Sequence, residues 1–111
     1  MKEDTEQKIE QLNLFEQNLQ NLLMQKQNFQ AQLMEIENAL EELSKSKDKV
    51  YKIVGSIMVL SEKKDIEKDL NSKKEIIELR IKNLDKQESK FKERVNEVQQ
   101  EVLKELKNKE G

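Results

Sequence analysis

An island of β-branched and aromatic residues, at positions 50–60, interrupts a chain that is otherwise made of long, highly charged helical repeats. The island reads Val-Tyr-Lys-Ile-Val-Gly-Ser-Ile-Met-Val-Leu, and its Gly55 is the only glycine before the terminal Gly111. Two runs of strand-forming residues around a glycine predict a β-hairpin, because glycine adopts the positive φ that a tight turn needs. The chain is therefore expected to reverse its direction here.

The segment before the island has a heptad pattern and contains neither glycine nor proline. One column of the repeat contains Leu12, Leu19, Lys26, Leu33 and Leu40, and the column three residues on contains Phe15, Leu22, Phe29, Ile36 and Leu43. A pattern that persists for more than four heptads predicts a coiled-coil helix, which we expect over residues 5–45. Lys26 is the one polar member. It is interpreted either as a side chain that extends from a two-helix seam into water or as a polar residue that fixes the register.

A second heptad pattern follows the island, and we expect a helix over residues 62–108. Its columns contain Leu70, Ile77, Leu84, Phe91 and Val98, and Lys74, Ile81, Glu88, Val95 and Val102. Ser61 is predicted to cap this helix, with Glu62 and Asp65 near its positive end. Because the two helices have similar lengths, the chain is predicted to form one domain of mainly α class. We expect a long antiparallel two-helix coiled coil with the hairpin, residues 50–60, at its bend.

The hairpin has large apolar residues on both of its faces. With Val54 and Gly55 as the two loop residues, Tyr51 faces Met58 and Ile53 faces Ser56. A half-solvated hairpin would alternate between apolar and polar residues, and an isolated two-stranded hairpin is marginally stable in water. We therefore expect several chains to join their hairpins in a shared sheet or barrel; the alternative is a hairpin folded over the end of its own coiled coil. The predicted oligomerisation residues are Val50, Tyr51, Ile53, Val54, Gly55, Ile57, Met58 and Val59.

Folding back also brings the two ends of the chain together, far from the hairpin. Apolar residues gather there, and exposed apolar surface usually marks an interaction site. Leu14 and Leu103 lie outside the seam columns, so they either bind another polypeptide or are scattered surface leucines that cap the seam. The candidate binding tip consists of Leu12, Leu14, Phe15, Val102, Leu103 and Leu106.

Composition argues against several classes of function. The chain has no histidine and no cysteine, and Gly55 is its single internal glycine, so we predict no catalytic, cofactor or metal site. The 21 basic and 23 acidic residues are interspersed, which disfavours nucleic acid and membrane surfaces as partners. Because no segment approaches the roughly 20 apolar residues of a membrane span and no signal peptide is visible, a cytoplasmic location is expected.

The hairpin segment, from Val50-Tyr51-Lys52 through Val54-Gly55-Ser56 to Ile57-Met58-Val59, resembles the central motif of the beta-class subunits of prefoldin, most closely the archaeal form. The segment Lys86-Gln87-Glu88-Ser89 is similar to a polar segment in the second helix of that family, whereas Leu60 stands where the family pattern has lysine. The resemblance covers nearly the whole chain. It implies a helix, one hairpin and a second helix, in a hexamer of two alpha-class and four beta-class subunits whose hairpins form a β-barrel body.

The same resemblance implies a function. The coiled-coil tips of such a hexamer hold unfolded proteins and deliver them to a group II chaperonin, without ATP. The alternative is a passive structural or tethering subunit of a prefoldin-like assembly, which shares the heptads but does not need a hairpin that is apolar on both faces.

Overall fold

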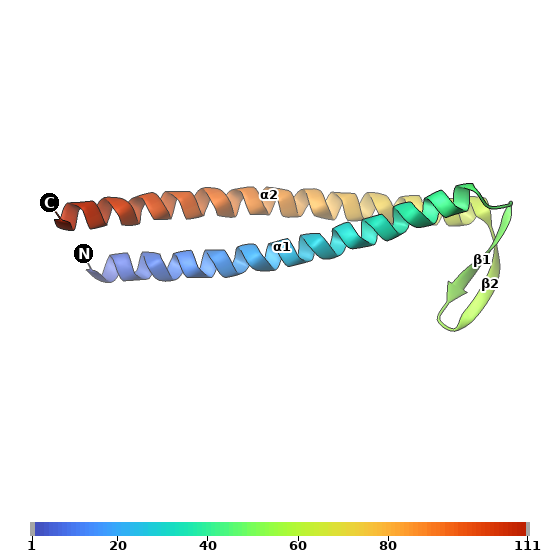
Figure 1. The fold of residues 1–111 in the computed structure, drawn as a ribbon, viewed down its shortest axis with the longest axis horizontal. Helices are drawn as coiled ribbons and strands as arrows, with labels where there is room; N and C mark the ends of the chain where they lie inside the picture. The colour runs from blue at the N-terminus through green and yellow to red at the C-terminus, as the bar shows by residue number, and fades with distance from the viewer. Residues whose placement is uncertain (1, 111) are drawn as a thin grey trace. The chain divides into compact units, whose positions relative to one another are not determined.

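The computed structural model describes residues 2–110, with side-chain burial for residues 4–108. Helix α1 (Lys2–Ser44) is followed by strands β1 (Lys49–Val54) and β2 (Ile57–Glu62) and by helix α2 (Lys63–Glu110) (Figure 1). The predicted fold class, two long helices with an antiparallel hairpin between them, is confirmed. In the described part of the chain, neither helix is long and apolar enough to cross a membrane.

The residues divide into two compact units, which are described separately. The terminal unit contains Met1–Lys26 and Lys82–Gly111, and the hairpin unit contains Gln27–Ile81. In both units every position of the predicted heptad columns is buried or half-buried. The most deeply buried apolar side chains all belong to these columns: Leu22, Leu43, Ile77, Leu84, Val98 and Val102. The columns therefore form the seam between α1 and α2 within each unit.

In the terminal unit, the polar interruptions of the two seam columns meet. Lys26 Nζ lies 2.6 Å from an Asp85 carboxylate oxygen and 3.4 Å from Glu88 Oε2. The hydrogen bond to Asp85, with a further one to Glu88, raises the pKa of Lys26. A hydrogen bond from Lys92 and another from Lys26 lower the pKa of Glu88. A lysine paired across the seam is what a register-fixing residue requires, since a shift of one helix would separate the charges.

Aromatic contacts close the seam of the same unit further along. The rings of Phe15 and Phe91 have centroids 6.1 Å apart and are tilted by 57°. The guanidinium of Arg94 lies over Phe15, with its Cζ 5.9 Å from the ring centroid. Tilted aromatic pairs and cation–π contacts both add stability beyond the area that they bury. Both rings are half-buried, and Arg94 covers part of Phe15.

The seam of the terminal unit continues one heptad beyond the apolar positions. Thr5 is buried and donates a 2.6 Å hydrogen bond to Glu105 Oε2, while the Lys8 ammonium pairs with the other oxygen of Glu105 and lies 3.5 Å from Glu101. The Lys8 hydrogen bond, followed by that of Thr5, lowers the pKa of Glu105. This end of the seam is therefore closed by polar contacts.

In the hairpin unit, α1 and α2 are joined by similar contacts in the same antiparallel sense. Arg80 lies 5.5 Å from the centroid of the Phe29 ring, and the seam residue Lys74 lies 3.9 Å from Glu37. Helix α1 has no basic residue in its last turn. Instead Lys63, the first residue of α2, donates from its ammonium to the carbonyls of Ser44 and Ser46 at 3.4 and 3.2 Å. A cation there stabilises the negative end of the α1 dipole.

The hairpin loop lies one residue later than predicted, which shifts each cross-strand partner by two residues. Val54 pairs with Ile57 and Tyr51 with Leu60, so the loop is Gly55–Ser56 and not Val54–Gly55. Gly55 has φ +62°, and no other described residue has positive φ. Positive φ at the first loop position alone is typical of a type II′ turn, whereas the predicted loop would have placed the β-branched Val54 at that position.

The predicted cap of α2 is also wrong. Ser61 does not precede the helix directly; it lies within β2, paired with Val50, and its hydroxyl donates a 3.5 Å hydrogen bond to the Val59 carbonyl. The first helical amide, that of Lys63, is satisfied by the Asp48 carbonyl at 2.8 Å. Asp65 does lie in the first turn, as expected.

Candidate assembly and client-binding surfaces

The corrected register gives the hairpin two adjacent apolar cross-strand pairs on one face, next to the charged pair Lys49–Glu62 at the base of the same face. Directly opposed residues of an antiparallel pair lie on the same face, so Tyr51, Leu60, Ile53 and Met58 share one face, hereafter the Tyr51 face. These four side chains are between 55% and 70% exposed. Most of the apolar surface of each is therefore available to a partner, which a stable soluble protein rarely tolerates without a use for it.

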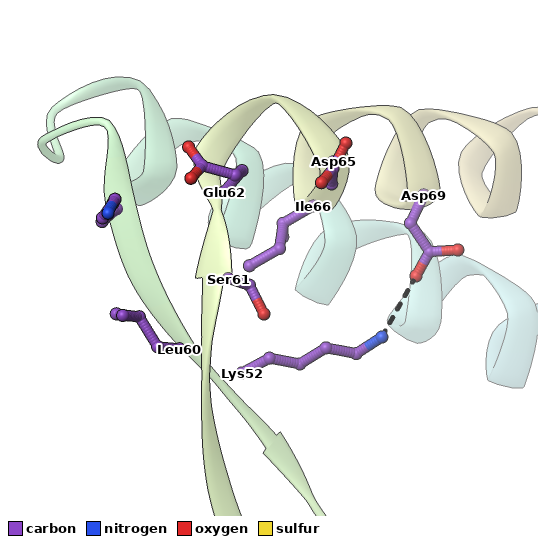
Figure 2. Close-up of a pocket in the computed structure, with 8 residues that line it drawn as sticks. Lys52, Leu60, Ser61, Glu62, Asp65, Ile66 and Asp69 are labelled. Atoms are coloured by element: carbon purple, nitrogen blue, oxygen red, sulfur yellow. Dashed lines mark ion pairs between the residues drawn. The ribbon is translucent and has the colours of Figure 1, made fainter.

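The opposite face of the hairpin, hereafter the Lys52 face, is tied to α2. Figure 2 shows Lys52 extending from β1 toward Asp69, and the two charged groups lie 3.9 Å apart. Near the base of the hairpin, Val50 and Ser61 on this face are half-buried, whereas Val54 and Ile57 near the loop are exposed. The contact with α2 thus covers the base of one face and leaves the Tyr51 face open.

A small hollow lies between the hairpin and the first turns of α2. It is lined by Lys49, Lys52, Leu60, Ser61, Glu62, Asp65, Ile66 and Asp69 (Figure 2). Its cations and carboxylates offset one another, and Asp69 is shared between Lys52 and Lys73. The ion pair between Lys52 and Asp69 therefore links the hairpin to α2 across this hollow.

The predicted oligomerisation residues lie on both faces and in the loop. Tyr51, Ile53 and Met58 lie on the Tyr51 face, and Gly55 forms the turn. Val50, Val54, Ile57 and Val59 lie on the Lys52 face, with Val59 among the exposed residues. Leu60 was missing from the prediction, because the predicted register placed it opposite Lys49, outside the expected hairpin; in the structure it lies opposite Tyr51, next to the Ile53–Met58 pair.

The six residues of the candidate tip are not equally accessible. Leu14, Leu103 and Leu106 are exposed, Leu12 and Phe15 are half-buried, and Val102 is buried in the seam. Leu103 and Leu106 line one surface hollow on α2, whereas Phe15 lines another with Phe91 and Arg94. The accessible part of the candidate tip is therefore carried by three leucines.

Among the residues that the structure describes, no group of three or more acidic, histidine or cysteine side chains is arranged to hold a metal ion. The two candidate surfaces consist of apolar side chains on a hairpin and at a helix end, and such surfaces bind polypeptides. A comparison with known proteins identifies the kind of protein that carries them.

A family model described as prefoldin subunit matches residues 6–109. The chain belongs to the prefoldin family. Its structure is similar to the crystal structure of the prefoldin beta subunit from Thermococcus strain KS-1, with a TM-score of 0.88 and 32% identity, over 93% of this chain and 92% of that one. The resemblance to the beta class of prefoldin subunits, predicted from the hairpin motif, is confirmed.

Curated prefoldin beta subunits match over shorter segments. The protein from Archaeoglobus fulgidus is 52% identical over 66 residues, which are 58% of this chain and 57% of that protein. Prefoldin subunit beta from Saccharolobus islandicus is 42% identical over 65 residues, 57% of this chain and 52% of that protein. The matched segments thus span little more than half the length of these relatives. Prefoldin subunits are chaperone subunits without enzymatic activity, and they assemble with other prefoldin subunits.

Proposed function

We propose that this chain is the beta-class subunit of a cytoplasmic chaperone particle that holds unfolded proteins without ATP and delivers them to a group II chaperonin. Its hairpin joins it to an alpha-class prefoldin subunit and to further beta subunits, in a hexamer of two alpha and four beta chains. The tips of its helices hold the client. The observation that carries the proposal is the Tyr51 face, four large apolar side chains left open on a hairpin.

The energetics support assembly through this face. Complete burial of a large apolar side chain contributes about 1.5–3 kcal/mol. With about two thirds of each side chain still exposed, burial of Tyr51, Ile53, Met58 and Leu60 contributes on the order of 4–8 kcal/mol per chain. Bringing chains together costs free energy of similar size. This cost is offset when several hairpins combine and each pairs with a neighbour along both of its open strand edges. A closed ring of hairpins satisfies both the apolar face and the open edges.

The accessible leucines of the tip support client binding. Leu14, Leu103 and Leu106 are exposed on the terminal unit, outside the buried seam, so their side chains can contact a client. Each leucine contributes little, but several arms that bind one unfolded chain raise the effective concentration for the remaining contacts. Reversible holding without a nucleotide follows from many weak contacts.

Substitution of one residue on the Tyr51 face tests the assembly. Ile53→Asp places a charge in the proposed interface, while Leu79→Asp places the same charge at an exposed apolar residue of α2 outside the hairpin. We expect light scattering to find single chains or small species for Ile53→Asp and full particles for Leu79→Asp, each mixed with half a molar equivalent of an alpha-class subunit. A full particle with Ile53→Asp would reject assembly through the hairpin.

A second experiment separates the chaperone from a tethering subunit. The triple variant Leu14→Ser, Leu103→Ser and Leu106→Ser removes the accessible tip without touching the seam. The particle should form normally and lose its ability to suppress aggregation of a chemically unfolded test protein. If the unmodified particle never suppresses aggregation, the tethering function is correct.

A further inference from the structure

The exposed leucines near the end of α2 are accompanied by positive charge. Gln100, Leu103, Lys104, Leu106 and Lys107 line one surface hollow, hereafter the C-terminal basic–apolar surface. All five side chains are exposed. The aliphatic stems of lysines beside leucines extend an apolar surface while their ammonium groups remain in water. The surface thus offers apolar contact area bordered by two cations.

The acidic residues in the same turns of α2 form contacts with α1. Lys8 of α1 pairs with both Glu101 and Glu105, and Thr5 also donates to Glu105. Neither Lys104 nor Lys107 lies within 4.0 Å of a carboxylate among the side chains that the structure describes. Helix α1 therefore engages both of these acids through Lys8 and Thr5, whereas Lys104 and Lys107 remain beside the leucines.

We infer that the C-terminal basic–apolar surface selects unfolded segments in which apolar residues alternate with aspartate or glutamate. This inference rests on the proposed client-holding function and names the class of client segment that the tip prefers. Apolar side chains of such a segment cover Leu103 and Leu106, and its carboxylates meet Lys104 and Lys107. A segment with lysine or arginine in the same places is disfavoured by like charge.

The size of the preference follows from the exposure of the two lysines. An exposed ion pair changes binding by a factor of about 1.5–5, so two pairs favour an acidic segment over a neutral one by roughly 2–25-fold at low salt. Screening reduces this ratio, because the Debye length falls from about 10 Å at 0.1 M salt to about 3 Å at 1 M. The apolar contribution persists at high salt.

Three peptides of equal length test the inference. They carry the same leucines and valines and differ only in their alternating residues, which are glutamate, glutamine or lysine. Their dissociation constants for the assembled particle are measured by fluorescence anisotropy at low and high salt. The test variant is Lys104→Gln with Lys107→Gln. Its control is Lys82→Gln with Lys86→Gln, which removes the same charge from exposed positions of α2 outside this surface.

We expect the unmodified particle to bind the glutamate peptide several-fold more tightly than the glutamine peptide and to bind the lysine peptide most weakly. The order should disappear in the Lys104 and Lys107 variant and at high salt, and it should persist in the Lys82 and Lys86 variant. Equal binding of all three peptides by a particle that still suppresses aggregation would overturn the inference alone.

Two further outcomes are informative. A particle that neither binds a peptide nor suppresses aggregation would contradict the proposed function itself. Binding to vesicles of anionic phospholipid that depends on Lys104 and Lys107, without a preference among the peptides, would assign the surface to a membrane and overturn the inference.

Discussion

The seam between α1 and α2 makes a quantitative prediction at Leu84. This side chain is 7% exposed, whereas Leu79, five residues earlier in the same helix, is 59% exposed. The substitutions Leu84→Ala and Leu79→Ala remove the same atoms and change helix propensity equally. Any difference between the two variants therefore reports burial in the seam.

Leu84→Ala should lower the free energy of unfolding by about 2–4 kcal/mol, because removal of a buried leucine loses its transfer free energy and leaves a cavity. We expect the lower half of this range, since a seam between two helices lies close to water and can partly collapse. Leu79→Ala should change the free energy of unfolding by no more than about 0.5 kcal/mol. Guanidinium unfolding, followed by circular dichroism at equal chain concentrations, measures both.

The comparison between the two variants tests whether α1 buries Leu84. Equal losses in the two variants would refute the seam as the source of stability. A loss at Leu79 larger than that at Leu84 would mean that Leu79, and not Leu84, lies in the seam.

Three other predictions concern the turn, the cation–π contact and the acidic seam residues. Gly55→Ala should destabilise the hairpin by about 1–2 kcal/mol, because a side chain at φ +62° is strained. Ser56→Ala, in the same loop, should be nearly neutral. The yield of assembled particle measures the effect of each substitution. Arg80→Lys should lower the free energy of unfolding by about 0.5–1 kcal/mol. An unchanged free energy of unfolding would exclude a stabilising contact between Arg80 and the Phe29 ring. Because Glu88 and Glu105 have lowered pKa values, their stabilisation is present above the ordinary glutamate pKa of 4.5 and is lost as pH falls below it. The free energy of unfolding, measured as a function of pH, should show this loss. The loss should be smaller in the variant Glu88→Gln with Glu105→Gln.

The helices could be predicted from the sequence because a heptad repeat specifies which residues are buried without knowledge of the partner. Even the polar members Lys74 and Glu88 are half-buried, as their columns require. What the columns do not specify is which residue of one helix faces which residue of the other. That pairing depends on the position of the loop, which the hairpin sets.

The loop itself was predicted one residue too early, although a signal was present. A Val54–Gly55 loop would put a β-branched residue at the first turn position, where two-residue hairpin loops need positive φ, whereas Gly55–Ser56 needs positive φ at glycine alone. Lys26 and Asp85, which form an ion pair, lie at equal distances along the chain from the Gly55–Ser56 loop.

Other features were not predictable from sequence patterns. Lys63 stabilises the end of α1 from the start of α2, and Lys8 holds two acids of α2; both contacts depend on the approach of segments distant in sequence. The candidate tip was predicted as one set of six residues, although Leu12, Phe15 and Val102 belong to the predicted seam columns. Their burial in the structure agrees with those columns, and Leu14, Leu103 and Leu106 remain exposed.

Oxidation of methionine tests assembly through the Tyr51 face most directly. Met24, Met34 and Met58 are 63%, 65% and 64% exposed in the single chain, so peroxide should oxidise all three at similar rates unless a partner covers one of them. In the assembled particle, mass spectrometry should find Met58 oxidised at least about tenfold more slowly than Met24 and Met34, and the difference should vanish in the Ile53→Asp variant. Equal oxidation of all three methionines in an intact particle would contradict the account, because the hairpin would then be exposed and the chains held together elsewhere.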